Sequence, residues 1–287
     1  MGTKYLSRKE KLSFTVAAFG RSGIYTIMTM FYMVFLVDVV FQGMKNAGVT
    51  ASTIILAGRI FDAANDPIMG MIVDRTRTKW GKMRPYLLFS PIPIAITTIL
   101  LFWAPGFASS GAKIAYAAVT YILWGVMFTI QDVPFWGLSA VITPNEQERT
   151  SFLSTARLGS TFGGILPSLL IPVLRNSTLG LKNGYLVGAV IFALLGAALS
   201  SLAFFNTKER VEQSEKTPSL KESIQMVAKN KLLLIVIMAA VLGSTMVIAN
   251  ISADYISNYL ILQNGNNGFI PKLSLIHISE PTRLRCI

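Results

Sequence analysis

Long apolar runs separated by short polar segments dominate the pattern along this chain. A helix that crosses a bilayer needs about 20 mostly apolar residues, and this length predicts seven transmembrane helices. Their expected bounds are 12–40, 50–72, 86–104, 113–138, 151–174, 184–205 and 232–260. The pattern therefore predicts an all-α polytopic membrane protein, with six helices over residues 1–205, a linker over 206–231 and the start of a second half over 232–272.

Two local patterns refine this outline. Within the linker, the apolar residues of 219–229 share one face of a helix, so a short amphipathic helix is one interpretation and a disordered tether is the other. Among the spans, Gly159 with Gly163 and Gly184 with Gly188 have the small-residue spacing that lets membrane helices approach closely. We expect these glycines to serve helix packing rather than chemistry.

Composition agrees with a membrane location. Hydrophobic residues make up 52% of the 287 and charged residues 14%, whereas about a quarter of the residues in a soluble domain are charged. The net charge of +12 reflects basic loops beside the spans, so we expect a lipid bilayer and no nucleic acid as partner. A single cysteine and a single histidine exclude a disulfide framework and a His/Cys metal site.

The distribution of Lys and Arg between the loops predicts the orientation. With the N-terminus in the cytoplasm, the inside segments hold sixteen of these residues and the outside loops hold four. Cytoplasmic loops carry the excess of positive charge. We therefore expect a multi-pass protein of the cytoplasmic (inner) membrane with its N-terminus inside.

The C-terminal residues have an unusual sequence. Residues 273–283 read LSLIHISEPTR, which resembles the translation of a transposase-type sequencing adapter. We interpret residues 273–287 as an artefact and expect the natural sequence to be interrupted near Lys272, while a genuine exterior loop is the alternative. The only histidine, His277, and the only cysteine, Cys286, both lie in this tail.

Ionisable residues inside the predicted spans are few, and each is costly in hydrocarbon. They are Arg21, Arg59, Asp62, Asp66, Asp132 and Arg157. One interpretation is internal ion pairing that fixes helix packing, since three arginines and three aspartates nearly cancel. The other is a transport pathway, because intramembrane charges commonly mark ion and substrate sites.

Spacing favours a site on the second predicted helix. Asp62 and Asp66 are four residues apart and Asn65 lies between them, so all three share one helix face. Two carboxylates and an amide oxygen are hard ligands that suit a small cation, here Na⁺ or a proton.

The fourth predicted helix repeats this arrangement. Thr129, Asp132 and Trp136 fall on one face, and a hydroxyl, a carboxylate and an indole together suit a sugar. Trp136 alone is also typical of a membrane-interface anchor. Arg157 and Arg21 supply donors from neighbouring helices, and Arg21 is equally a candidate partner for Asp62 or Asp66.

Three segments together identify a family resemblance. They are KLSFTVAAFGR, RIFDAANDPIMGMIVDRTRTKWGKMRP and TYILWGVMFTIQDVPFWGL. They resemble the glycoside-pentoside-hexuronide:cation symporters, the melibiose-permease-like branch of the major facilitator superfamily, over about residues 11–231. The resemblance implies twelve helices in two six-helix halves around a central cavity with alternating access. This chain then supplies the N-terminal six-helix half, the linker and helix seven, and is truncated after them.

The resemblance also implies roles for individual residues. It assigns the cation site to Asp62, Asn65, Asp66 and Thr129, and the sugar site to Asp132, Trp136 and Arg157. Arg21 stands where melibiose-type members have a lysine, and Ser22 stands where they have a sugar-binding aspartate. This departure makes a glycoside, pentoside or hexuronide other than melibiose the expected cargo. Asn250 and Tyr255 are further candidates, with helix contact as the alternative for Asn250.

The basic segment between the second and third predicted helices, residues 74–84, resembles the superfamily's loop at that place. Its charges either latch the cytoplasmic side closed or fix the topology. For the latch we select Asp74 and Arg75.

The sequence thus predicts cation-coupled sugar import, with a coupling Na⁺ or H⁺, no enzymatic activity and no cofactor. The full-length protein is expected to be a monomer, and residues 1–272 alone are not expected to transport. Two other functions remain open: a transporter-like sugar sensor that moves nothing, and a lysolipid symporter.

Overall fold

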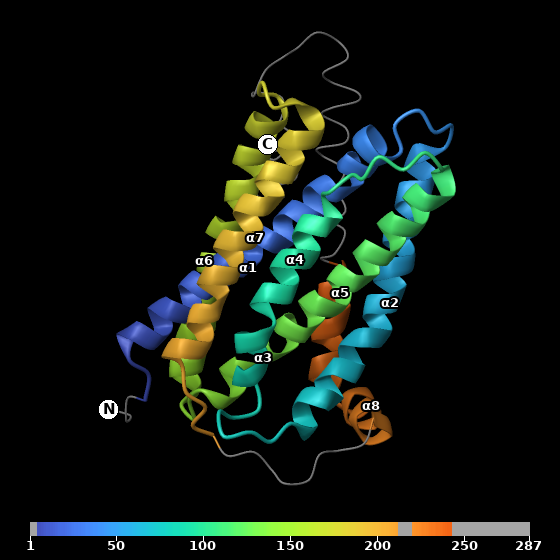
Figure 1. The fold of residues 1–287 in the computed structure, drawn as a ribbon. Coiled ribbons are helices and arrows are strands. Elements are labelled where there is room, and N and C mark those ends of the chain that lie inside the picture. The colour runs from blue at the N-terminus through green and yellow to red at the C-terminus, as the bar shows by residue number, and fades with distance from the viewer. Residues whose placement is uncertain (1–4, 212–219, 243–287) are drawn as a thin grey trace, which may run out of the picture. The chain divides into compact units, whose positions relative to one another are not determined.

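The computed structural model describes residues 5–211 and 220–242, and it divides into two units, Met1–Thr217 and Pro218–Ile287 (Figure 1). The described residues form helices and contain no strand. The helices of the first unit are α1 (Arg8–Phe35), η1 (Leu36–Val40), α2 (Ala47–Arg75), α3 (Arg84–Phe89), α4 (Pro91–Leu101), α5 (Ser110–Val141), α6 (Glu146–Arg175) and α7 (Gly180–Asn206). This confirms the expected all-α class.

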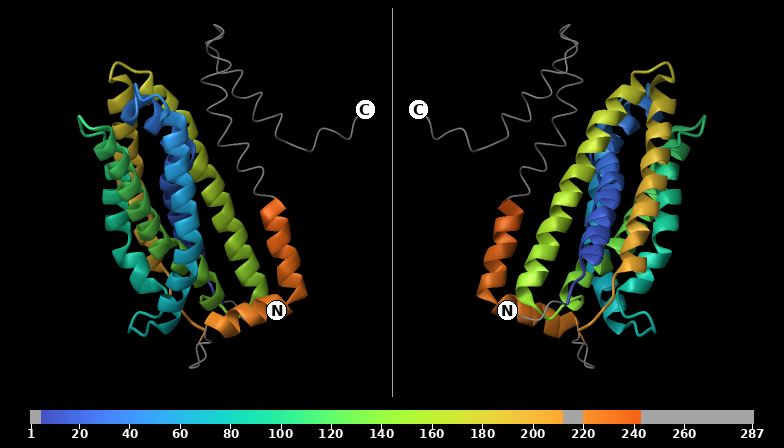
Figure 2. Two further views of the ribbon diagram at one scale, coloured as in Figure 1. Left: turned by 90° about the vertical axis from the view of Figure 1, so that its right-hand side faces the viewer. Right: turned by 90° about the vertical axis from the view of Figure 1, so that its left-hand side faces the viewer.

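Five helices in the described part are long and apolar enough to cross a membrane, and they match five predicted spans. They are α1 with η1, α2, α5, α6 and α7. In Figure 2 the axes of the long helices of the first unit extend along the length of one bundle, and the chain reverses direction from each span of that unit to the next.

The third predicted span differs from the single helix expected over 86–104. The structure has two helices, α3 and α4, which meet at Ser90 and end at Leu101. Pro91 and Pro93 follow the junction, and proline lacks the N–H that continues a helical ladder. The backbone nevertheless stays helical, since Ser90 has φ −71° and ψ −29° and its carbonyl accepts from the amide of Ile94 at 3.0 Å. The third predicted span is therefore two consecutive helices in this structure, and α4 alone is shorter than a span requires.

Helix α1 lies at the centre of this unit and packs most extensively against α6 and α7, while α2 packs mainly against α5 (Figure 1). The close approach of α6 depends on Gly159 and Gly163, where a Cβ would collide with the backbone carbonyls of Thr15 and Phe19. The predicted packing role of this glycine pair is confirmed. Gly184 of α7 likewise lies against the backbone of α6.

Two hydrophobic clusters fill the bundle, one on each side of a polar layer. Tyr32, Phe35 and their neighbours form one cluster around α1, α4 and α5. Phe14 and Phe135 belong to the other, and their rings stack at 4.3 Å between centroids. Because α1 and α5 pass through both clusters, the polar residues between these levels are held in place from both sides.

The second unit contains two described helices, α8 (Leu220–Lys229) and Lys231–Leu242. Helix α8 favours the amphipathic-helix interpretation of the linker over the disordered tether. The seventh predicted span is helical as far as Leu242. Its remainder, the candidates Asn250 and Tyr255, and the tail at 273–287 lie outside the described residues.

Candidate functional site

The polar layer between the two clusters is centred on an ion pair. Arg21 of α1 donates through Nη1 to Oδ1 of Asp132 on α5. Arg21 is only 7% exposed, and a buried cation requires a charged partner to offset its desolvation. The alternative partners Asp62 and Asp66 are therefore wrong for this structure, because among the described residues Arg21 forms its ion pair with Asp132, and Asp62 pairs with Arg59 instead.

Aromatic rings surround this pair. The Arg21 guanidinium carbon lies 5.2 Å from the centroid of the Trp136 ring, and that of Arg157 on α6 lies 5.6 Å from the same ring. Both distances suit cation–π attraction. Three of the predicted sugar-site side chains and Arg21 thus meet in one place, with Trp136 inside the bundle beside Arg21 and Phe135 rather than standing alone as an anchor.

The predicted cation residues lie where α2 faces α5. Thr129 donates its hydroxyl to Oδ1 of Asp66 at 2.9 Å. Asp62 lies against Gly125, where a Cβ would stand 2.7 Å from Oδ1 of Asp62. This helix pair therefore brings both carboxylates to the same face of α5 as Thr129.

The donor set fits a small cation. Asp62 is half-buried and Asp66 is exposed, so both carboxylates can be reached. The side-chain nitrogen of Asn65 is buried and has no hydrogen-bond partner among the described residues. A half-turn of the amide group exchanges its nitrogen and oxygen, so the side chain can turn its oxygen to the same point. Carboxylate, amide and hydroxyl oxygens are the ligands that hard cations prefer.

Two residues near this point were absent from the predicted site. Arg59 lies one turn before Asp62, and its Nη1 is 3.8 Å from Oδ2 of that carboxylate. Gly125 provides the space into which Asp62 fits. The i,i+3 spacing of Arg59 and Asp62 is visible in the sequence, whereas the role of Gly125 depends on how α2 and α5 pack.

The remaining predicted residues lie elsewhere. Asp74 is twelve residues after Asp62, which is about 18 Å along a helix axis, and its carboxylate pairs with Lys82 in the following loop. Arg75 is exposed at the end of α2. Ser22 faces α6, with its hydroxyl 3.5 Å from the position of a Cβ on Gly164. The two latch candidates therefore form a group separate from the site.

The chain is similar to known transport proteins over most of its length. Residues 13–276 match a family model described as MFS/sugar transport protein. The inner membrane symporter YicJ of Escherichia coli (strain K12) is 32% identical over 235 residues, which cover 80% of this chain and 49% of the relative. The isoprimeverose transporter of Lactiplantibacillus pentosus is 32% identical over 231 residues, 77% of this chain and 46% of the relative.

A third relative is more distant. The glucuronide carrier protein homolog of Escherichia coli (strain K12) is 28% identical over 264 residues, 91% of this chain and 57% of that protein. The chain therefore spans about half the length of the curated relatives it matches.

Proposed function

Because the chain belongs to the MFS/sugar transport protein family, among the glycoside-pentoside-hexuronide:cation symporters, we propose that it couples import of a glycoside, pentoside or hexuronide to entry of Na⁺ or H⁺. The family consists of multi-pass membrane transporters rather than enzymes. The proposal places the N-terminus in the cytoplasm, on the basis of the loop charges.

One observation carries this proposal: the two predicted sites share one turn of α5. Thr129, which donates to Asp66, precedes Asp132, which pairs with Arg21, by three residues. Residues three apart on a helix lie on the same face. A change at the cation residues is therefore transmitted to the sugar residues through a single rigid helical turn.

The proposed mechanism assigns each residue a physical task. The cation is held by Asp62, Asp66, Thr129 and the amide of Asn65, and it offsets the repulsion between the two carboxylates. Asp62 then no longer depends on Arg59 for compensation. With the carboxylates neutralised, α2 packs more closely on α5, and this packing orders the sugar residues that α5 carries. Each ligand raises the affinity for the other, because this coupling is reciprocal.

Each sugar residue is assigned a different contact with the cargo. Asp132 accepts hydrogen bonds from sugar hydroxyls, and Arg157 donates them. The Trp136 ring covers an apolar face of the sugar. Arg21 orients the Asp132 carboxylate through their ion pair. Ser22 provides no carboxylate near α6, which supports a cargo other than melibiose.

The cation half of the proposal is testable on this chain alone, because all four predicted ligands lie within it. Binding of radioactive sodium, with and without competing protons, is measured on the 287-residue protein in lipid nanodiscs. Saturable binding is expected, with loss of at least tenfold in affinity for Asp62→Asn and for Asp66→Asn. Glu146→Gln, an exposed carboxylate at the start of α6, is the matched control and should bind as the wild type does.

The coupling half needs the length of the curated relatives. Sugar affinity is measured across sodium concentrations in a version of this chain extended by a second six-helix half, with and without Asp62→Asn. A sodium dependence that the mutation leaves unchanged overturns the cation assignment. Sugar binding without accumulation in vesicles identifies a sensor instead of a transporter.

A further inference from the structure

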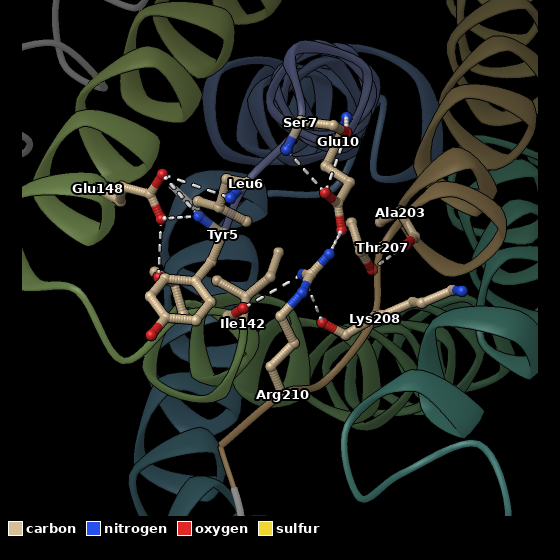
Figure 3. Close-up of polar contacts among 11 residues, drawn as sticks. Tyr5, Leu6, Ser7, Glu10, Ile142, Glu148, Ala203, Thr207, Lys208 and Arg210 are labelled. Carbon is tan, nitrogen blue, oxygen red and sulfur yellow. Dashed lines mark hydrogen bonds and ion pairs between the residues drawn. The ribbon is translucent and has the colours of Figure 1, made fainter. Parts of the chain in front are cut away.

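The five residues that follow α7, Thr207 to Val211, make contacts with several parts of the first unit. We call them the clasp. They are the last described residues before the boundary between the two units, which falls at Thr217. Figure 3 shows Thr207 and Arg210 of the clasp beside the start of α1 and the end of α5. Thr207 is buried and its hydroxyl donates to the carbonyl of Ala203 at 2.5 Å.

Glu209 fixes the loop between α2 and α3. Its carboxylate accepts the backbone N–H groups of Lys82 at 2.9 Å, Met83 at 2.8 Å and Arg84 at 3.1 Å. Helix α3 begins at Arg84. The first N–H groups of a helix have no carbonyl one turn earlier to bond to, so these amides need another acceptor. Gly81 has φ +104°, and a Cβ there would collide with the Glu209 carboxyl group. The loop is therefore shaped around this one carboxylate.

Arg210, the next residue, is directed to a different part of the bundle. Its Nη2 donates to Oε1 of Glu10 on α1 at 2.8 Å, and Glu10 is only 7% exposed. The backbone amides of Arg210 and Val211 both donate to the carbonyl of Val141, at 2.8 and 3.0 Å. Adjacent clasp residues thus attach α7 to the α2–α3 loop on one side and to α1 and α5 on the other.

The loop that Glu209 fixes also carries the latch candidate. Lys82, whose amide Glu209 accepts, pairs through its side chain with Asp74. Arg84 also contacts Phe204 of α7. Its Nη2 donates to the backbone carbonyl of Phe204 at 2.8 Å, and its Cζ lies 4.8 Å from the centroid of the Phe204 ring. The position of the Asp74–Lys82 pair therefore depends on the clasp.

We propose that the clasp is a mechanical coupling element, in which Glu209 positions the α2–α3 loop and Arg210 ties that position to α1 and α5. The backbone from residue 207 onward is the covalent route from the helices of the first unit to the second unit. A displacement that arrives along that route reaches the clasp before it reaches α7, the helix that ends at Asn206. The two anchors then move the loop and the ends of α1 and α5 together. All of these contacts lie inside the first unit, and none involves a predicted sugar residue.

Hydrogen–deuterium exchange on the 287-residue chain in nanodiscs tests the proposal. Glu209→Ala should speed exchange of the amides of Lys82, Met83 and Arg84 by roughly 10- to 100-fold, because hydrogen bonds to a charged acceptor are among the stronger ones. Exchange in the middle of α5 should not change. Lys208→Ala, which alters an exposed neighbour, is the matched control and should leave these amides as in the wild type.

Transmission between the two anchors needs a second variant. Arg210→Ala should speed exchange at residues 210–211 and, several-fold, at residues 82–84, although Arg210 does not touch that loop in the described contacts. Glu10→Gln, which removes the charge of the partner and keeps its shape, should have the same effect in a smaller degree if Arg210→Ala does not fold.

Two outcomes overturn the proposal. If Glu209→Ala leaves the three loop amides protected, the carboxylate does not hold the loop. If Arg210→Ala or Glu10→Gln affects residues 210–211 alone, the two anchors are independent local caps and the clasp couples nothing.

Discussion

Helices α1 and α2 both carry charges into the bundle, yet they are packed very differently. Of the apolar stretch of α1 with η1, 56% is buried, against 17% of that of α2. The buried charges of α1, Glu10 and Arg21, are each ion-paired within the described residues. On α2, Asp66 is exposed and accepts one hydrogen bond from Thr129.

This difference separates positioning charges from ligand-binding charges. A buried charge is costly unless it is paired, so those of α1 are committed to other residues and orient them. A carboxylate on a loosely packed helix face still has oxygen lone pairs that can coordinate an ion. The comparison predicts that substitutions on α1 change stability first, whereas those on α2 and its partner Thr129 change cation affinity first.

Arg21→Ala should have the largest effect. The substitution leaves the Asp132 carboxylate without the Arg21 guanidinium and should lower the free energy of unfolding by about 3 kcal/mol. This is the lower part of the range for breaking a buried ion pair, because Asp132 is partly exposed. Thermal unfolding of the chain in nanodiscs measures this. Arg157→Ala is the control, because this exposed arginine lies near the same Trp136 ring and should cost far less.

A double variant sharpens this first prediction. Combining Arg21→Ala with Asp132→Asn removes the unpaired charge, so part of the lost stability should return. An Arg157→Ala effect as large as that of Arg21→Ala contradicts the assignment of Arg21 as the positioning charge.

Gly163→Ala should rank next. A Cβ there meets the backbone of Phe19, and backbone cannot move aside as a flexible side chain does. Overpacking of this kind should cost about 1–3 kcal/mol, measured by the same thermal unfolding. Wild-type stability in this variant would mean that α1 and α6 do not pack closely at this point.

Thr129→Val should have a smaller effect, and on affinity rather than stability. The substitution keeps the shape and removes the hydroxyl that donates to Asp66. Sodium affinity should fall about tenfold, since a hydrogen bond to a charged group contributes about 1.5 kcal/mol or more. Thr129→Ser retains the hydroxyl and should bind as the wild type does. If both variants bind sodium normally, Thr129 is not part of the site.

Sequence patterns predicted the parts of this molecule that depend on local periodicity. The long spans follow from apolar length, and the shared face of Asp62, Asn65 and Asp66 follows from helix geometry. The partner of Arg21 did not follow, because three intramembrane carboxylates were available and the choice depends on the rotation of α1 in the bundle. Glu209 gave no local pattern, since its contacts lie at residues far away in the chain.

Gly70→Ala tests the loose packing of α2 and should have the smallest effect. A Cβ at Gly70 meets nothing within 4 Å, so the added methyl group should stabilise the helix by about 0.5–1 kcal/mol through reduced backbone entropy. Gly163→Ala is the matched variant, because it makes the same substitution on the side of α6 that faces α1. The thermal unfolding of both variants is measured and compared. Destabilisation by both to the same extent would remove the contrast between the two helices. If Gly70→Ala is harmless in this chain and costly in a version extended by a second half, the open face of α2 is a surface on which that half packs.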